Sequence, residues 1–156
     1  MSVAAFVQSQ FKPNHKGRIL ALGEWSVDLE LLLAPGWEAV HVNHDAKRVH
    51  DGLKSIACDI GQDSHFVCLL EGYWVKAVTV VDIFTQFSGP YDLISLDVTG
   101  KNRMLWHTEC MYAAWPRVFI LPEDGHNEAL IEVADKKHGY KATVIDDRLV
   151  LAREPE

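Results

Sequence analysis

Cysteine is scarce in this sequence, and the three that occur form no recognisable framework. Cys58, Cys68 and Cys110 are odd in number and widely spaced, whereas disulfide scaffolds carry even sets of cysteines and structural zinc sites carry closely spaced pairs. We therefore expect three reduced thiols in a cytoplasmic protein. The eight histidines do not combine with paired cysteines into a zinc-ligand pattern either, so we expect no metal site.

Long hydrophobic runs are missing as well. No apolar segment approaches the ~20 residues that a helix needs to span a bilayer. The short apolar patch at residues 3–7 has no basic residue before it, unlike a signal peptide. Basic residues are outnumbered, with 15 Lys and Arg against 22 Asp and Glu and a net charge of -7. Because a broad basic stripe is also lacking, we expect neither a membrane nor a nucleic acid as the partner.

What the sequence contains is enough for one domain. A chain of 156 residues, 48% of them hydrophobic, buries a sizeable core without disulfides or metal ions. We expect a weak helix or arm at residues 1–17 and a single domain at residues 18–156. Apolar runs closed by glycine or an acid predict strands at residues 18–23, 38–42, 55–60, 91–98 and 117–121. Helical spacing predicts helices at residues 26–33, 46–54, 79–87, 102–115 and 127–138, with Ser26 and Asn127 as N-caps.

The order of these segments predicts an α/β fold, a doubly wound and mostly parallel sheet that ends in a C-terminal antiparallel hairpin. The hairpin is expected at residues 141–145 and 149–152, across the turn at residues 146–148. Residues 65–70 are expected to add a strand or hairpin arm, and residues 72–76 to form a loop. Ligands of such sheets bind beyond the carboxyl ends of the strands. The polar candidates at predicted strand ends are Gly23, Glu24, Asn43, Asp45, Asp59, Asp97 and Glu123.

Residues 91–102, with the sequence YDLISLDVTGKN, are the most informative stretch, since an apolar run stops there at an acid, a small polar residue and a glycine. This stretch resembles the strand of FkbM-type methyltransferases that ends in an Asp-Val-Glu-Gly phrase. Residues 78–82 (VTVVD) resemble the family's Thr-Leu-Asp phrase at a helix start, and residues 117–123 (RVFILPE) resemble its strand that runs into an acid. With Gly139 and Tyr140 before the hairpin, the resemblance covers residues 18–153.

The resemblance implies the class I methyltransferase fold, which is Rossmann-like, and S-adenosylmethionine as the cofactor. Glycine after the first strand would let the backbone approach the cofactor closely, and a carboxylate after the second strand would accept hydrogen bonds from both ribose hydroxyls. The implied cofactor contacts are Gly23 and Glu24 in the first loop, Asn43 and Asp45 at the ribose, and Asp59 and Ile60 at the adenine.

Asp97 and Glu123 are the implied catalytic residues, with Asp97 near the methionine moiety or the acceptor and Glu123 near the acceptor. Methyl transfer requires in-line alignment and, at most, a base that removes a proton from the acceptor. Each residue also has an ordinary structural interpretation. Gly23 would form a strand-to-helix turn, Asp97 would cap a helix, and Asp45, Asp59 and Glu123 would be loop or turn acids.

The sequence leaves two main functions open. The first is an O-directed methyltransferase that acts on an unknown acceptor, either a small molecule or a protein. The second is a catalytically inactive relative, a pseudoenzyme, that serves as a protein-interaction module with an exposed apolar patch or as a homo-oligomer. Trp25 in the first loop and Thr99 in place of the family's glutamate favour the second. A degenerate Rossmann nucleotide-binding domain is a third interpretation, but the sequence has no G-x-G-x-x-G motif to support it.

Overall fold

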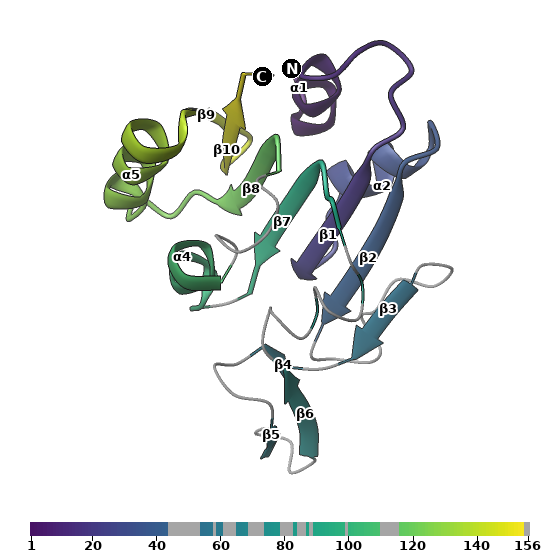
Figure 1. Ribbon diagram of the computed structural model, residues 1–156, viewed down its shortest axis with the longest axis vertical. Coiled ribbons are helices and arrows are strands. Elements are labelled where there is room, and N and C mark those ends of the chain that lie inside the picture. The colour runs from purple at the N-terminus through teal and green to yellow at the C-terminus, as the bar shows by residue number, and fades with distance from the viewer. Residues whose placement is uncertain are drawn as a thin grey trace.

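The computed structural model describes residues 1–43, 54–57, 59–60, 65–68, 74–78, 83, 87, 89–98, 100–109 and 116–154. These residues form a seven-stranded sheet and a separate three-stranded sheet (Figure 1). The order of the large sheet is β3-β2-β1-β7-β8-β10-β9. Its strands are β1 (Arg18–Gly23), β2 (Glu38–Asn43), β3 (Lys54–Ala57), β7 (Leu93–Asp97), β8 (Val118–Pro122), β9 (Tyr140–Ile145) and β10 (Arg148–Arg153).

The pairing of the strands confirms the predicted fold class. β3, β2, β1, β7 and β8 are parallel neighbours, whereas β10 runs antiparallel between β8 and β9. The hairpin turn is made by Asp146 and Asp147, whose φ angles of 49° and 61° are both positive. Two positive φ angles define the type I′ turn, which matches the right-handed twist of a two-residue hairpin.

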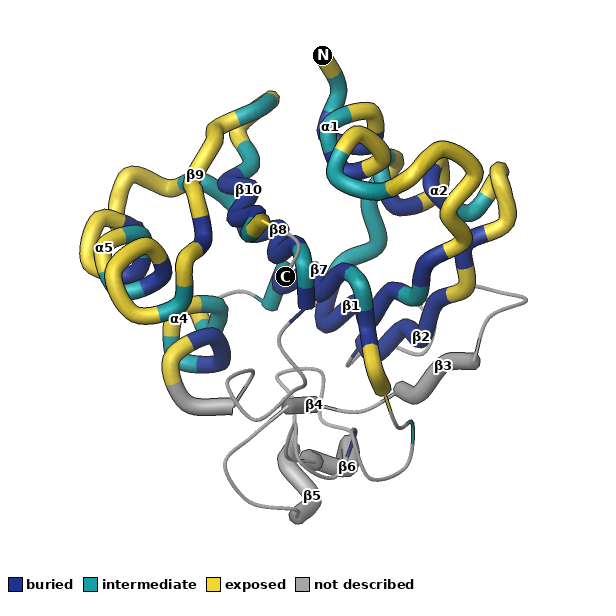
Figure 2. Tube along the Cα trace, turned by 45° about the horizontal axis from the view of Figure 1, so that its top comes forward, coloured by how far each residue is buried: buried dark blue, intermediate teal, exposed yellow. Residues whose placement is uncertain are grey.

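Helices cover both faces of the large sheet. They are α1 (Val3–Ser9), α2 (Val27–Leu33), α4 (Asn102–Met104), which continues as a π-helical turn over Leu105–Glu109, and α5 (Glu128–His138). One apolar cluster joins α1 and α2 to one face, and a second cluster joins Trp106 and α5 to the other. The central strands are therefore dark blue in Figure 2, while the outer sides of the helices are yellow. Burial on both faces explains why the parallel strands are continuous apolar runs.

Several local predictions are confirmed in detail. Residues 18–23 form β1, and α2 begins after Ser26, whose Oγ accepts a hydrogen bond from the Leu29 backbone N–H at 3.3 Å. The added strand expected at residues 65–70 is β5 (His65–Cys68). At residues 1–17 the expected helix is α1, and its Val3 and Val7 side chains are buried in the core.

Other predictions are wrong or are confirmed only in part. The strand expected at residues 55–60 is divided between β3 of the large sheet and β4 (Asp59–Ile60) of the small one, because β4 takes its hydrogen bonds from β6 (Trp74–Val78). Residues 72–76 are not a loop throughout, since β6 begins at Trp74 and pairs with β5. Asn127 is the N-cap residue of α5, as predicted, although its side chain makes no capping hydrogen bond. The helix expected at residues 102–115 is confirmed over residues 102–109, which are α-helical to Met104 and π-helical from Leu105 to Glu109, while residues 110–115 lie outside the described residues.

The helix expected at residues 46–54 lies outside the described residues except for Lys54, which begins β3. Within the helix expected at residues 79–87, the structure describes Ile83, which is helical, and Phe87, which is not. The small sheet lies beyond the arrowhead ends of β1, β2 and β7 in the view of Figure 1. Among the described residues, no helix has both the length and the apolar character needed to cross a membrane.

Candidate functional site

The carboxyl edge of the large sheet is centred on Gly23 and Asp97, which are register partners at the ends of β1 and β7. Gly23 has a φ of +100°, and a Cβ on it would lie 2.1 Å from the Asp97 carbonyl oxygen. The next backbone N–H, that of Glu24, donates to the same oxygen at 3.1 Å. The contact between the two strands therefore requires glycine at this position, independently of any ligand.

The carbonyl oxygen of Gly23 holds two buried side chains of β2. Asn43 Nδ2 donates to it at 3.1 Å, and His41 Nε2 lies 2.7 Å from it. Because a carbonyl oxygen accepts only, Nε2 of His41 carries a proton. His41 and Asn43 are 0% and 1% exposed, so the hydrogen bond between the Asn43 amino group and this carbonyl is buried inside the protein. Asn43 thus lies at the predicted place, but its amide braces the end of β1.

Trp25 covers this arrangement from the three-residue connection between β1 and α2. Its ring centroid lies 5.3 Å from that of His41 at an interplanar angle of 50°. Its Nε1–H donates to the Glu30 carboxylate at 2.8 Å. The half-buried indole is held by α2 on one side and by β2 on the other, so a bulky side chain is fitted into the loop that follows β1.

Asp97 forms an ion pair with Arg148. One guanidinium nitrogen donates to Asp97 Oδ2 at 3.0 Å, and the side chains are 27% exposed for Arg148 and 23% exposed for Asp97. Arg148 begins β10, whose antiparallel direction brings it opposite Pro122 at the carboxyl end of β8. No described residue bonds to Oδ1 of Asp97. The turn after β7 is capped instead by Asn102, whose Oδ1 accepts from the Val98 N–H at 2.8 Å, so Asp97 is not the helix cap.

Glu123 follows β8, the strand beside β7, and is tied into its own loop. Its Oε1 accepts from the Gly125 N–H at 2.7 Å, and its Oε2 lies 3.5 Å from the Asn127 amino group. Asn127 also donates to the Pro122 carbonyl at 3.1 Å and accepts from Arg103 at 3.2 Å. This loop is therefore braced from within, which agrees with the structural interpretation of Glu123.

Arg103 links α4 to the same loop through Asp124. The guanidinium donates to the exposed Asp124 carboxylate at 2.7 Å, and this hydrogen bond is the main reason why the pKa of Asp124 lies below its usual 3.8. The backbone N–H of His126 adds to the effect.

The remaining predicted residues are not brought to this centre by the described structure. Asp59 and Ile60 form β4 of the small sheet and do not end a strand of the large one. Asp45 lies outside the described residues. The prediction did not include Arg148, although an antiparallel last strand places its first residue at the carboxyl edge. Within the described part of the chain, no group of three or more His, Cys, Asp or Glu side chains is arranged to hold a metal ion.

Comparison with known proteins gives the fold but no family. No protein-family model and no curated protein matches the chain. The methyltransferase MycE of the mycinamycin pathway, solved with magnesium and S-adenosylhomocysteine, is 11% identical with a TM-score of 0.55 over 97% of this chain and 48% of its own. The T. thermophilus 16S rRNA methyltransferase RsmC, solved with S-adenosylmethionine and guanosine, is 18% identical with a TM-score of 0.56 over 98% of this chain and 42% of its own.

A third similar structure is the C-terminal domain of a precorrin-6Y methyltransferase from Rhodobacter capsulatus, which is 10% identical with a TM-score of 0.54. It covers 97% of this chain and 88% of its own. The chain thus has the fold of class I S-adenosylmethionine-dependent methyltransferases and spans less than half the length of MycE and of RsmC.

The described residues fit one part of S-adenosylmethionine. At the methionine end, Oδ1 of Asp97 offers an acceptor to an ammonium group, and Arg148 fixes the orientation of the carboxylate. At the ribose, the Asn43 amino group is already bonded to Gly23, and the described residues supply no carboxylate after β2. The acid nearest in sequence is Asp45, outside the described residues.

Proposed function

We propose that this chain binds S-adenosylmethionine at the carboxyl edge of the large sheet and is an O-directed methyltransferase of the FkbM type. The observation that supports this most strongly is the Asp97 carboxylate, which is partly exposed at the centre of that edge and has one oxygen without a partner among the described residues. MycE and RsmC, which share the fold, were solved with cofactor or product bound.

In this proposal each residue has a defined task. S-adenosylmethionine, when bound, supplies an activated methyl group, so the protein mainly aligns the reactants. Oδ1 of Asp97 accepts hydrogen bonds from the cofactor's ammonium group, while Arg148 holds the carboxylate in place. Glu123, at the end of the neighbouring strand, would contact the acceptor hydroxyl and take its proton as the methyl group passes from the sulfonium sulfur to the acceptor oxygen and S-adenosylhomocysteine is released. The acceptor is a small molecule or a hydroxyl group on a protein partner.

Calorimetric titration of S-adenosylmethionine and S-adenosylhomocysteine tests the proposal. The native chain should bind both, and Asp97→Asn should weaken binding about 10- to 100-fold, the usual effect of losing a hydrogen bond to a charged group. The matched control is Asp135→Asn on α5, which removes the same charge from an exposed ion pair with Lys141 of β9 and should leave the affinity unchanged. A folded sample that gives no heat at millimolar ligand would contradict the proposal.

A second function, an inactive module that binds another protein, is favoured by two observations. Trp25 is packed against His41 directly after β1, where close cofactor approach is expected. On α2, Val27 and Leu31 are 76% and 51% exposed one helical turn apart. In this alternative the native chain binds no cofactor and forms an oligomer or complex that Leu31→Lys disrupts, as measured by light scattering.

A further inference from the structure

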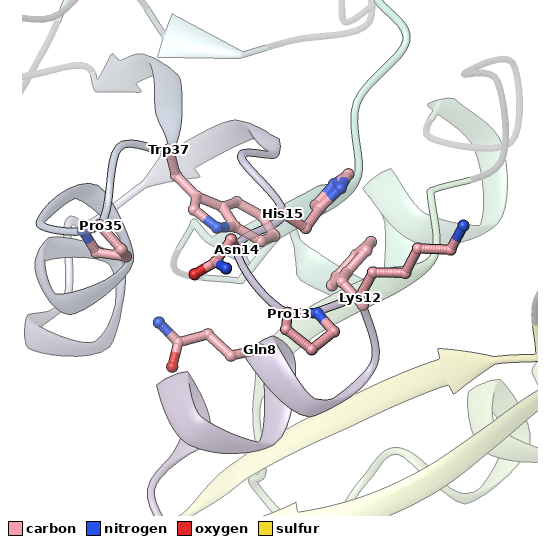
Figure 3. A pocket seen from close by; sticks show the side chains of 8 residues that line it. Gln8, Lys12, Pro13, Asn14, His15, Pro35 and Trp37 are labelled. Atoms are coloured by element: carbon pink, nitrogen blue, oxygen red, sulfur yellow. The ribbon is translucent and has the colours of Figure 1, made fainter.

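The described structure contains a cavity of about 300 Å³ at the opposite, amino edge of the large sheet. It lies between the segment that follows α1 and the turn from α2 into β2 (Figure 3). Its volume is at the lower end of the range for small-molecule sites. Neither the sequence predictions nor the proposed methyltransferase site uses this cavity.

One wall of the cavity is a rigid aromatic group. Trp37 packs edge-to-face against Phe11 and His15, with ring centroids 5.3 Å and 5.7 Å away, and the rings of Phe11 and His15 stack at 4.7 Å. Behind Trp37 is Gly17, where a Cβ would lie 2.5 Å from the indole. Trp37 is 5% exposed, so it is fixed before any ligand arrives. Since little of its ring is exposed, Trp37 forms with Pro35 a rigid apolar wall against which the edge of a flat, unsaturated ring can pack.

Two amides provide the polar part of the lining. The side chains of Gln8 and Asn14 point into the space that Trp37 and Pro35 border (Figure 3). Both residues are exposed, and neither amide hydrogen-bonds to any described residue. Each amide offers a donor and an acceptor side by side, which is the pattern that pairs with the edge of adenine.

Two lysines lie beside this cavity, and one carboxylate is also near, since Asp92 Oδ2 is 3.5 Å from Nε2 of the lining residue His15. Lys12 lines the cavity. Lys16 passes beside Gly36, where an added Cβ would be 3.3 Å from its Cε. Neither lysine has an acidic partner among the described residues, so both are available to a ligand phosphate.

We propose that this amino-edge cavity binds a purine nucleoside monophosphate. The base lies against Trp37 and Pro35 with its edge on the amides of Gln8 and Asn14, and the phosphate is held by Lys12 and Lys16 at the rim. This combination matches a ligand that is flat and rich in donors and acceptors at one end and anionic at the other. The inference is independent of the proposed cofactor site at the carboxyl edge.

The test is calorimetric titration of adenosine monophosphate into the whole chain at low salt, with adenosine and inorganic phosphate as separate probes. The nucleotide should bind more tightly than either probe. Asn14→Gly keeps the backbone at its φ of 64° but removes the amide, and Lys12→Ala removes a charge. Each should weaken binding at least about fivefold, the effect of one lost hydrogen bond.

Matched controls use residues that the cavity does not include. Gln10→Ala removes an amide from the same segment, and Lys137→Ala removes a charge from α5; both should bind as the native chain does. The proposal would be overturned if the native chain gave no heat with the nucleotide, or if Asn14→Gly and Lys12→Ala bound it as tightly as the native chain does. It would also be overturned if inorganic phosphate alone bound as tightly as the nucleotide. Asp97→Asn should retain nucleotide binding, so failure of the carboxyl-edge site is distinguishable from failure of this one.

Discussion

Gly23 and Asp97 face each other across β1 and β7 so closely that a Cβ on Gly23 would lie 2.1 Å from the Asp97 carbonyl oxygen. The two residues thus join the ends of the central strands at the edge where we place the cofactor. Gly23 also accepts hydrogen bonds from two β2 side chains, and Asp97 pairs with Arg148 of β10. Four strands therefore meet in one hydrogen-bonded cluster.

Gly23→Ala should destabilise the protein by about 2–5 kcal/mol, since it combines an unfavourable φ with a collision against backbone. The measurement is urea unfolding followed by far-UV circular dichroism. Gly125→Ala is the control, because Gly125 has a positive φ of 81° but nothing within 4 Å of its added Cβ. Gly125→Ala should lower the unfolding free energy by about 1–2 kcal/mol. If Gly23→Ala and Gly125→Ala lost the same unfolding free energy, the contact of Gly23 with Asp97 would not be tight.

Asn43→Asp tests whether the Gly23 carbonyl needs a donor. At neutral pH the new carboxylate would place a buried acceptor against an acceptor, which should cost about 2–4 kcal/mol of unfolding free energy. Burial raises the pKa of such a carboxyl, so its protonated form is favoured in the folded state. The loss should therefore shrink as the pH falls toward 4, where the protonated acid donates to the carbonyl. A loss independent of pH would argue against this hydrogen bond.

The pair of Asp97 and Arg148 should show direct coupling in a double-mutant cycle. Asp97→Asn and Arg148→Met, alone and together, should give a coupling free energy of about 1–2 kcal/mol, because both side chains are mostly buried and their bond is charge-assisted. The cycle is measured by chemical unfolding at moderate salt. A coupling near zero would mean that Arg148 does not orient the carboxylate in solution.

Tyr140 should make the protein sensitive to alkali. Its side chain is fully buried, its hydroxyl donates to the Pro116 carbonyl at 2.6 Å, and burial raises its pKa well above the ordinary 10.0, against a smaller opposing effect of Arg153. A raised pKa favours the protonated form in the folded state, so this stabilisation is complete below pH 10 and is lost as the pH rises above it.

Tyr140→Phe should cost about 1 kcal/mol at pH 7 and flatten the decline in stability above pH 10. Thermal unfolding between pH 7 and pH 11 gives both quantities for the two proteins. The prediction would be contradicted if the stability of the native and Tyr140→Phe chains declined equally steeply above pH 10.

Local rules predict the elements whose signals lie within a few residues. The run at residues 18–23 gives β1, Ser26 caps α2, and Asp146 and Asp147 make the hairpin turn. The misplaced parts depend on partners far along the chain. β4 belongs to the small sheet because it pairs with β6. The residue spacing within residues 55–60 does not reveal this pairing.

In the candidate site, too, the local sequence predicts where residues lie but not which distant residues they contact. Strand-end reasoning brings Gly23, Asn43 and Asp97 to one edge, as the structure has them. It does not show that the Asn43 amide turns inward to Gly23, or that Asp97 is paired with a residue 51 positions away. Those choices are made by three-dimensional neighbours, so the partners of a polar side chain are harder to predict than its place on the sheet.

The most direct test of the account is a nitrogen–proton NMR correlation spectrum recorded with increasing S-adenosylhomocysteine. Binding at the carboxyl edge should shift the backbone amides of Gly23, Glu24 and Val98 in a saturable way and leave the side-chain amides of Gln8 and Asn14 unchanged. Shifts confined to Gln8 and Asn14, or none at saturating ligand, would contradict a cofactor site at the ends of β1 and β7.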